Sequence, residues 1–383
     1  MLYSTVISMN RKFIEHHIFS ILNSIQTKPL DVFLSHYLRK HKNIGSKERS
    51  AICEPIYGMI RWRGLLDYLC KGSISWESRY EIYSSINPLD YIHEINIPAH
   101  IRVSFPKDLF QCIEEAFGEE KAIQLCLLSN TKAPTTIRTN TLKTTRQALL
   151  EKWKEIYDVS PTLESTEGIT FHKRINFFGL PEFKEGLFEI QDEGSQLLAK
   201  LVQPLPKEHV FDYCAGSGGK TLAFAPSMEN KGVIYLHDIR DFALEEAKKR
   251  LRRAGIQNAQ LMYYDDPKKN RLKHKMEWVL VDAPCSGLGT IRRNPDMKWK
   301  INPETIERLC IEQKEIFKKA LEFLHPKGQI VYATCSMLPK ENEEQTAYFM
   351  KTFELELVKE LKILPQEGGM DGFYGAVYKR KPI

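Results

Sequence analysis

The chain has no apolar run of the ~18 residues that a membrane-spanning helix needs, and its first residues lack the parts of a secretory signal. Its eight cysteines are scattered through 383 residues, and no two of them form a Cys-x-x-Cys pair. This spacing argues against a disulfide framework and against a structural zinc site. We therefore expect a cytoplasmic protein without a bound metal, and we take it to be a monomer.

Composition and charge fit a folded protein that binds nucleic acid. The hydrophobic share of 42% and the charged share of 27% are ordinary for globular proteins, and the length allows two or three domains of roughly 100–200 residues. The net charge is only +6, but Lys and Arg gather at 248–255, 268–275 and 291–300. The first run continues an amphipathic helical stretch and indicates a solvated face, whereas the third suits a polyanion such as RNA.

The periodicity of the sequence changes twice along the chain. Residues 1–130 carry apolar residues at i, i+3 and i+4, which predicts an all-helical domain. Residues 131–205 mix β-like segments with one helical stretch, which predicts a small α+β domain. From 206 to 383, apolar β-like runs alternate with amphipathic helical stretches, so we expect an α/β Rossmann-like domain with a doubly wound, mostly parallel sheet.

A glycine-rich turn, FDYCAGSGGKT at 211–221, follows the first strand of this predicted sheet. Gly216, Gly218 and Gly219 would let the backbone approach a ligand closely. The stretch fails the phosphate-binding pattern GxxxxGK[ST] because Cys214 stands where glycine is required, and it fails GxGxxG because of Thr221. The turn therefore favours neither an ATPase nor a dehydrogenase.

Acidic residues end three consecutive predicted strands, at Asp238, Asp265 and Asp282. A carboxylate in the position of Asp238 commonly binds ribose hydroxyls, although Asp238 would also suit the N-cap of the next helix. Three carboxylates and a glycine turn along one edge suit a nucleoside ligand that has hydroxyl and amino groups but no pyrophosphate. S-adenosylmethionine has this character.

A cysteine follows two of the strand-like runs, Cys285 in VDAPCSG, shortly after Asp282, and Cys335 in VYATCSM. The stretches DAPCSGLGTIRRNPDMKW and YATCSMLPKENEEQ, together with DYCAGSGGKT, resemble the signature motifs of the Sun/Nol1/Nop2 family of RNA (cytosine-5) methyltransferases. The resemblance covers nearly the whole chain and is greatest to members that act on 16S (small-subunit) rRNA. It implies a NusB-like RNA-binding domain at 1–130, a small RRM-like α+β segment at 131–205 and a methyltransferase domain at 206–383.

The resemblance also implies a role for each site residue. Cys335 would attack C6 of cytosine, which makes C5 nucleophilic, and Cys285 would assist release of the methylated product. Asp282 would hold the amino end of the cofactor and stabilise the N3-protonated base. If the two cysteine-bearing strands are neighbours, their ends lie roughly 5 Å apart and both thiols can face one base. The residues expected to line the S-adenosylmethionine site are Cys214, Ala215, Gly216, Ser217, Gly218, Gly219, Lys220, Asp238, Asp265 and Asp282.

The family usually reads CAAPGGKT, so Gly216-Ser217 replaces an Ala-Pro pair and the turn loses a proline that fixes its backbone. This allows weaker cofactor binding without implying loss of activity. Cys214 is interpreted as core packing in spite of its place in the turn, and Asp266 is an alternative to Asp265 at the adenine.

Arg292, Arg293 and Lys298 follow Cys285 in sequence, and we expect them to contact RNA phosphates. An internal ion pair with Asp296 is the alternative for Arg293. The target base would have to be unpaired or extruded to reach the thiols.

Three functions stay open at this point. The first is a 16S rRNA cytosine-5 methyltransferase, and the second is the same chemistry on tRNA or another rRNA site. The third is a catalytically idle RNA-binding or assembly factor, against which the two retained cysteines argue. Fold alone would not separate these functions.

Overall fold

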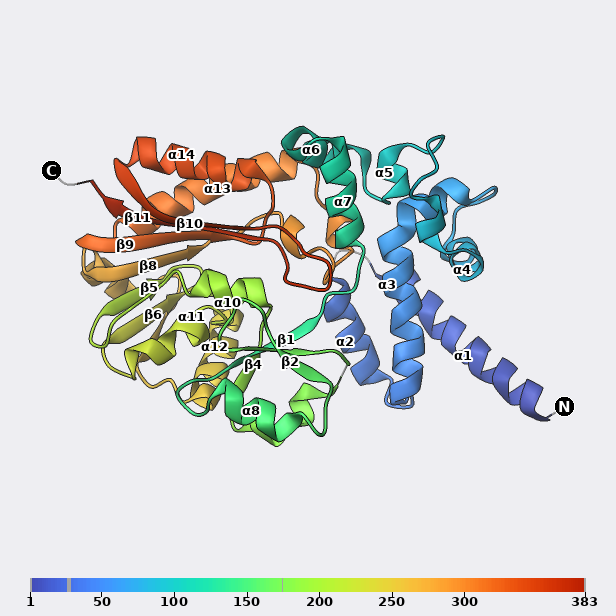
Figure 1. Ribbon diagram of the computed structural model, residues 1–383, viewed down its shortest axis with the longest axis horizontal. Helices are drawn as coiled ribbons and strands as arrows, with labels where there is room; N and C mark the ends of the chain where they lie inside the picture. Colours follow the sequence, from blue (N-terminus) through green and yellow to red (C-terminus); the bar gives the residue numbers. More distant parts are fainter. Residues whose placement is uncertain (1, 26–28, 174, 382–383) are drawn as a thin grey trace. The chain divides into compact units, whose positions relative to one another are not determined.

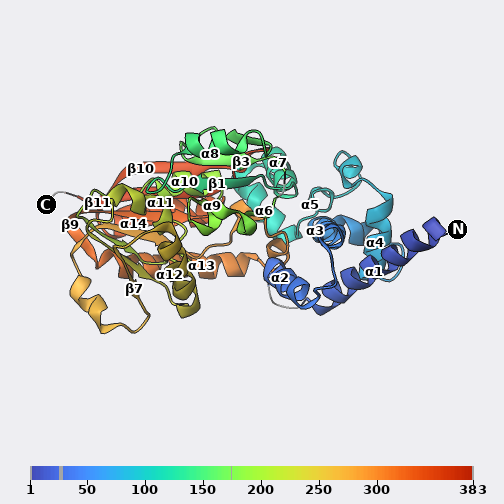
Figure 2. The ribbon, with the colours of Figure 1, turned by 90° about the horizontal axis from the view of Figure 1, so that it is seen from below.

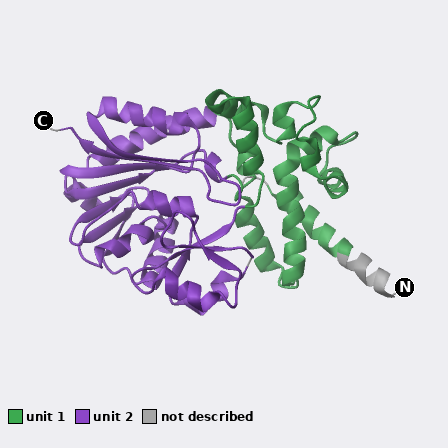
Figure 3. Ribbon diagram, viewed as in Figure 1, with its two compact units in different colours: residues 1–132, 291–303 green, residues 133–290, 304–383 purple. Residues whose placement is uncertain are grey.

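The computed structural model describes residues 2–25, 29–173 and 175–381, with side chains from Arg11 onward. The chain forms two compact units (Figure 3). Unit 1 comprises residues 1–132 together with 291–303, and unit 2 comprises residues 133–290 together with 304–383. The segment 291–303 thus belongs to unit 1, although its sequence position lies inside the predicted methyltransferase domain.

Unit 1 is helical. Helix α3 (Ser46–Leu69) buries Ile52, Ile56, Met59 and Leu66. These residues are three, four or seven positions apart, so they lie on one face of the helix. These side chains pack with α1 and α2, and Trp299 of the returning segment packs against the same cluster. The other helices of this unit are α1 (Leu2–Ser24), α2 (Leu30–Lys40), α4 (Trp76–Ser85), α5 (Ala99–Arg102), α6 (Lys107–Phe117) and α7 (Glu119–Ser129).

Unit 2 contains a small antiparallel sheet with the strand order β2-β3-β1-β4. The N-cap residue of helix α8 (Arg146–Trp153) is Thr145, whose hydroxyl accepts a hydrogen bond from Ala148 N, and the helix buries Trp153 against the sheet. Figure 2 shows α8 beside β3. The strands are β1 (Thr135–Thr139), β2 (Val159–Pro161), β3 (Gly168–Phe171) and β4 (Phe188–Ile190). Helix α9 (Pro181–Lys184) lies between β3 and β4 in sequence, and α10 (Glu193–Ala199) follows β4.

The second sheet of unit 2 has seven strands in the order β10-β11-β9-β8-β5-β6-β7 (Figure 1). The five strands from β9 to β7 are parallel, while β11 runs antiparallel to both of its neighbours. The bounds are β5 (His209–Asp212), β6 (Val233–His237), β7 (Ala259–Met262), β8 (Met276–Asp282), β9 (Leu324–Thr334), β10 (Leu355–Ile363) and β11 (Phe373–Arg380). The predicted Rossmann-like, mostly parallel sheet is confirmed.

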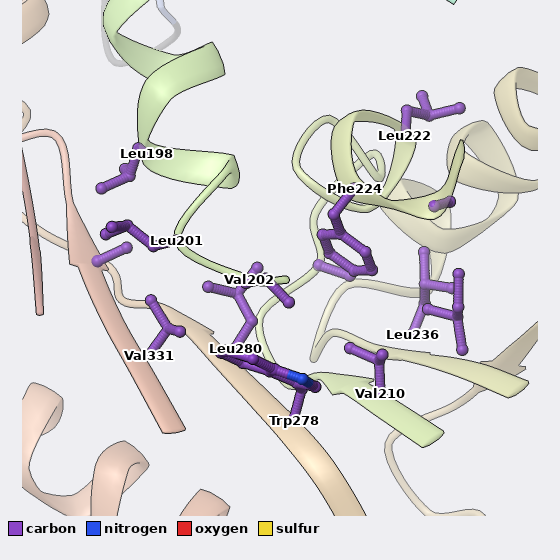
Figure 4. Packing of buried hydrophobic residues seen from close by; sticks show 14 of the residues in the cluster. Leu198, Leu201, Val202, Val210, Leu222, Phe224, Leu236, Trp278, Leu280 and Val331 are labelled. Carbon is purple, nitrogen blue, oxygen red and sulfur yellow. The ribbon is translucent and has the colours of Figure 1, made fainter. Parts of the chain in front are cut away.

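Helices cover both faces of this sheet, because the apolar strands have two buried faces. On one face α10, α11 (Thr221–Phe224) and α12 (Asp241–Ala254) pack on Val210, Leu236, Leu280 and Val331 (Figure 4). On the other face α13 (Pro303–Leu321) and α14 (Glu343–Thr352) pack through a second cluster that contains Phe317.

The register of the parallel strands places their carboxyl ends at one edge of the sheet. Asp212 pairs with Leu236 between β5 and β6, and Asp282 pairs with Ala333 between β8 and β9. The residues that follow these strands therefore converge, as the Rossmann-like topology requires. β8 and β9 are neighbours, which is the condition for bringing Cys285 and Cys335 together.

Candidate active site

A cavity of about 1050 Å³ lies in unit 2 at the carboxyl edge of the parallel strands. The small sheet and α13 supply part of its wall, and the loops after β5, β6, β7 and β8 supply the rest. Of the residues predicted to hold the cofactor, the wall includes Cys214, Ala215, Gly216, Ser217, Gly219, Lys220, Asp238, Asp265 and Asp282.

Gly218, the remaining predicted cofactor residue, faces a different neighbour. Its φ is +75°, and a Cβ at this position would lie 3.3 Å from the Cβ of Ala247 in α12. Gly218 therefore lets α12 pack closely against the turn. Gly216, with φ of +52°, adopts the left-handed conformation that favours glycine and lies on the cavity wall.

Ser217, which replaces the usual proline, is fixed by a side chain from α12. Arg250 Nη1 donates to the Ser217 hydroxyl at 2.7 Å and to its carbonyl at 2.9 Å. The same guanidinium pairs with the buried carboxylate of Glu189 in β4, at 3.0 Å from Nη2. The turn has lost a proline but gains an anchor that ties it to both α12 and the small sheet.

The carboxylate of Asp238 binds the glycine turn directly, since its Oδ2 accepts a hydrogen bond from Gly216 N at 2.8 Å. Arg240 donates to the same carboxylate from its backbone N and from its guanidinium. Burial acts to raise the pKa of Asp238, but the hydrogen bonds from Arg240 and Gly216 outweigh it and the pKa is lowered. Asp238 is thus an anion on the cavity wall, and Arg240, not Asp238, is the N-cap residue of α12.

The two acids after β7 have separate positions. Asp265 lies on the cavity wall. Asp266 instead caps the 3₁₀ turn at Pro267–Leu272, because its Oδ1 accepts a hydrogen bond from Lys268 N at 2.9 Å.

Lys220 and Asp282 form an ion pair at the floor of the cavity, where Lys220 Nζ donates to Asp282 Oδ2. Burial acts to lower the pKa of Lys220, but the charge of Asp282 and its hydrogen bond prevail, so the pKa is raised. Lys220 therefore places a positive charge beside β8.

The sulfur atoms of Cys285 and Cys335 lie 3.3 Å apart. Cys335 N also donates to the Cys285 sulfur at 3.3 Å, and Gly289 N donates to the Cys335 carbonyl at 2.9 Å. A Cβ on Gly289 would lie 2.2 Å from the Gly372 carbonyl oxygen, so this position requires glycine. The two cysteine-bearing loops are thereby held together by backbone contacts.

The pKa values of the two thiols are shifted in opposite directions. The hydrogen bond from Cys285 lowers the pKa of Cys335, against the effects of burial and of Asp282, and the charge of Lys220 acts in the same direction. The pKa of Cys285 is raised well above its ordinary value, first by its hydrogen bond to Cys335 and then by burial. Within the pair, Cys335 is therefore the thiol that ionises more readily.

Sequence reasoning missed one acid of this edge, Asp212, which ends β5. Its carboxyl is buried, Oδ2 accepts from Thr221 Oγ1 at 2.6 Å, and Oδ1 has no hydrogen-bond partner among the described residues. Burial raises the pKa of Asp212 to about 7. The sequence signal for Asp212 is its place at the end of a strand, which is the feature that identified Asp238 and Asp282 as site residues.

The small sheet contributes residues that sequence reasoning also missed. Gln191 and Ser195 line the cavity, and Gln191 Nε2 donates to the Gly219 carbonyl at 3.4 Å. Arg138 in β1, which is fully buried, reaches the same carbonyl at 3.3 Å and also donates to Gln191 Oε1. Gln191 and Ser195 both lie in the segment QDEGSQ at 191–196.

The predicted RNA contacts lie in unit 1, and the structure contradicts two of them. Lys298 is 0% exposed, and its Nζ donates to Arg61 O and Asn130 Oδ1 at 2.7 Å each. Burial lowers its pKa well below the ordinary lysine value. The Arg292 side chain is likewise buried, at 1% exposure, so neither residue offers its charge to a phosphate.

Arg293 is half-buried and stays a prediction. Asp296, its proposed internal partner, accepts hydrogen bonds from Lys300 Nζ at 2.7 Å and from Leu30 N at 3.2 Å.

No helix in the described part of the chain is long and apolar enough to cross a membrane. No group of three or more His, Cys, Asp or Glu side chains in that part is arranged to hold a metal ion.

Comparison with known families gives two matches. A model described as 16S rRNA methyltransferase RsmB/F matches residues 199–379. A model described as the RsmF/B-like ferredoxin-like methyltransferase domain matches residues 105–177.

Individual relatives agree with these matches. The ribosomal RNA small subunit methyltransferase B of Vibrio vulnificus is 32% identical over 329 residues, which cover 83% of this chain and 74% of that protein. The probable ribosomal RNA small subunit methyltransferase B of Synechocystis is 32% identical over 66% of this chain, and the match spans only 57% of that protein. A human 28S rRNA (cytosine(4447)-C(5))-methyltransferase is 29% identical over 73% of this chain and 35% of its own length.

A solved structure, that of a methyltransferase homologue from Pyrococcus horikoshii, has a TM-score of 0.64 and 27% identity, and it covers 77% of this chain and 99% of its own. The fold, the glycine turn with its acids and the extent of the match to the Vibrio protein lead to one assignment. The chain belongs to the RsmB/Sun family of S-adenosylmethionine-dependent ribosomal RNA methyltransferases.

Proposed function

We propose that this chain methylates C5 of a cytosine in 16S (small-subunit) rRNA through a covalent adduct with Cys335. The observation that carries the proposal is the pair of thiols 3.3 Å apart, one with a lowered and one with a raised pKa, beside the cavity suited to the methyl donor. Cytosine C5 is too weak a nucleophile to accept a methyl group until a nucleophile adds to C6. A thiolate is well suited to that addition.

Cys335 is the attacking group in this mechanism. Its sulfur forms a bond to C6, and the electron pair of the C5–C6 double bond makes C5 nucleophilic. S-adenosylmethionine supplies the methyl group from its sulfonium and leaves as the neutral thioether. Loss of the C5 proton then restores the double bond and expels the Cys335 thiolate.

Cys285 takes the C5 proton. In the free protein the charge of Cys335 opposes ionisation of Cys285. Once Cys335 is bonded to C6, that charge is gone, so Cys285 can lose its own proton to water and then accept the proton from C5. Burial still opposes its charge, which keeps its thiolate basic enough for proton removal.

The cavity fits S-adenosylmethionine through the chemistry of its wall. Asp238 offers a carboxylate for ribose hydroxyls, Asp282 one for the amino group of the methionine part, and Asp265 one for the adenine edge. Gly216 and Ser217 present backbone that a flat nucleoside can approach. S-adenosylmethionine has no phosphate group, so its binding does not require a phosphate-binding turn at a helix N-terminus.

The rRNA target is supported by the names of the relatives. Two bacterial relatives are named for the small ribosomal subunit, and the human relative is named for cytosine C5 of 28S rRNA. The base must leave its helix to reach the thiols, so an unpaired or extruded cytosine is the substrate.

Covalent trapping tests the proposal. The wild type, Cys335→Ala and Cys285→Ala are incubated with S-adenosylmethionine and cellular RNA, and protein–RNA adducts that resist denaturation are measured. We expect Cys285→Ala to accumulate an adduct and Cys335→Ala to form none. Sequencing the trapped RNA identifies the cytosine.

Other outcomes have definite meanings. Methylation of C5 by Cys335→Ala would show that another group is the nucleophile. Trapped tRNA in place of 16S rRNA would change the substrate and keep the chemistry. RNA binding by the wild type without detectable cofactor binding or methyl transfer would support the idle RNA-binding factor.

A further inference from the structure

Each cysteine of the pair is followed by a serine whose hydroxyl binds the same carboxylate. Ser286 follows Cys285, Ser336 follows Cys335, and both serine side chains are buried. Ser286 Oγ and Ser336 Oγ each donate to Glu341 Oε2 at 2.5 Å. One side chain therefore links the two loops that carry the thiols.

Glu341 is 0% exposed, and its second oxygen is also bound. Oε1 accepts hydrogen bonds from Ser286 N at 2.8 Å and from Gln313 Nε2 at 3.1 Å. Removing a carboxylate from water is costly unless donors replace the lost hydration, and here four donors do so. Such a fully bound carboxylate has one geometry, so the loops it joins have one relative position.

The segment that carries Glu341 is itself fixed to the end of β9. Tyr332 OH donates to the Glu341 carbonyl at 2.8 Å. The next residue, Asn342, accepts from Thr334 Oγ1 at 2.6 Å and donates to the Ser336 carbonyl at 3.1 Å. Glu341 is thus a rigid support and not a mobile surface acid.

The charge of Glu341 also reaches the thiols. It acts to raise the pKa of both Cys285 and Cys335, whereas the charge of Lys220 acts to lower the pKa of Cys335. The titratable groups that face them are Lys220, Asp282, Tyr332 and Glu341.

We propose that Glu341 is a positioning residue of the two-cysteine site, which holds both thiols in one relative position. The inference rests on the proposed use of both thiols in methyl transfer. Glu341 does not touch the base or the methyl donor in this account. It acts through Ser286 and Ser336.

The test compares Glu341→Gln with Glu344→Gln. The first keeps the shape of the side chain and removes its charge, and the second removes an exposed charge three residues away. For each variant we would measure kcat and KM for S-adenosylmethionine, and the pH dependence of iodoacetamide labelling of Cys285 and Cys335 by mass spectrometry. The labelling uses the protein without RNA.

We expect Glu341→Gln to lower kcat several-fold with an unchanged KM for S-adenosylmethionine. Labelling of Cys285 should begin at lower pH, because the negative charge that opposes its ionisation is gone. Glu344→Gln should match the wild type in both measurements. Wild-type kcat and an unchanged labelling profile in Glu341→Gln would overturn the proposal, and so would a lower kcat with an unchanged labelling profile.

Ser336→Ala supplies a second variant in case Glu341→Gln does not fold. It removes one link and keeps the carboxylate, the Ser286 bonds and the backbone bond from Gly289 to Cys335. We expect a smaller fall in kcat, and an unchanged kcat would contradict the positioning role. If Cys285→Ala forms no RNA adduct and the wild type transfers no methyl group, the proposed function fails, while the labelling profiles still decide whether Glu341 controls the thiols.

Discussion

Arg250 donates two hydrogen bonds to Ser217, at 2.7 Å to the hydroxyl and at 2.9 Å to the carbonyl, and so anchors the turn on which cofactor binding depends. In the family's usual sequence a proline fixes this turn. In this chain the hydrogen bonds from Arg250 in α12 restrict the turn in place of the proline ring.

This anchor predicts the effect of substitutions at Ser217. Ser217→Ala removes the hydroxyl that Arg250 binds, and we expect the Kd for S-adenosylmethionine to rise about threefold to tenfold, as loss of one charge-assisted hydrogen bond implies. Ser217→Pro is the matched control, because it restores rigidity without the hydroxyl and should bind nearly as well as the wild type. Equilibrium dialysis or calorimetry measures both. Equal affinity of Ser217→Ala and the wild type would show that the anchor is dispensable.

The hydrogen bond between the two thiols predicts how Cys335 reacts when its donor is lost. In Cys285→Ala the pKa of Cys335 should rise, because the largest cause of its lowered value is removed. Iodoacetamide labelling of Cys335 near neutral pH should therefore slow several-fold, and the labelling curve should move to higher pH. Cys310→Ala removes a thiol that bonds the Lys340 carbonyl and neither cysteine of the pair, and it should leave the curve unchanged. A faster reaction in Cys285→Ala would mean that burial, not hydrogen bonding, controls Cys335.

Asp212 predicts a pH dependence of stability. Its carboxyl ionises at about pH 7 in the folded protein and near ~4 when unfolded, so the folded state holds an extra proton between these values. Its contribution to stability is complete below the unfolded pKa and is lost as pH rises through the folded pKa. The wild type should thus lose stability relative to Asp212→Asn between about pH 4 and 7, by on the order of 1 kcal/mol per pH unit.

Urea unfolding of the wild type and of Asp212→Asn at several pH values measures this difference. Asp241→Asn, at an exposed carboxylate of α12, controls for the general loss of a surface charge. A difference between the wild type and Asp212→Asn that does not change with pH would show that Asp212 ionises normally.

Because Lys298 is buried, we expect its substitution to lower the stability of the fold without changing the contacts with RNA. Lys298→Ala leaves Asn130 Oδ1 and the Arg61 carbonyl without the donor they share, which should cost about 2 kcal/mol of folding free energy. Below its melting temperature the variant should bind RNA with an unchanged salt dependence. If Arg293 contacts a phosphate, Arg293→Ala should flatten that dependence. A flattened salt dependence in folded Lys298→Ala would return this lysine to the RNA interface.

The sequence by itself determined the parallel sheet and the edge where the site lies. Apolar runs alternating with amphipathic stretches leave strands with two buried faces, and acids and cysteines at the strand ends must then converge. The positions of Asp238, Asp265, Asp282, Cys285 and Cys335 followed from this local pattern. Their chemistry followed from the residue types and from the resemblance of the motifs.

Only the tertiary structure decided which charged side chains are exposed to solvent and which are buried with protein hydrogen-bond partners. Lys298 lies in a basic run that suits RNA, yet its partners are 168 and 237 residues away in sequence. Glu341 looked like one acid among several in ENEEQ, yet it binds the serine 55 residues before it. A local pattern gives periodicity, whereas burial and hydrogen-bond partners depend on segments that meet only when the chain folds.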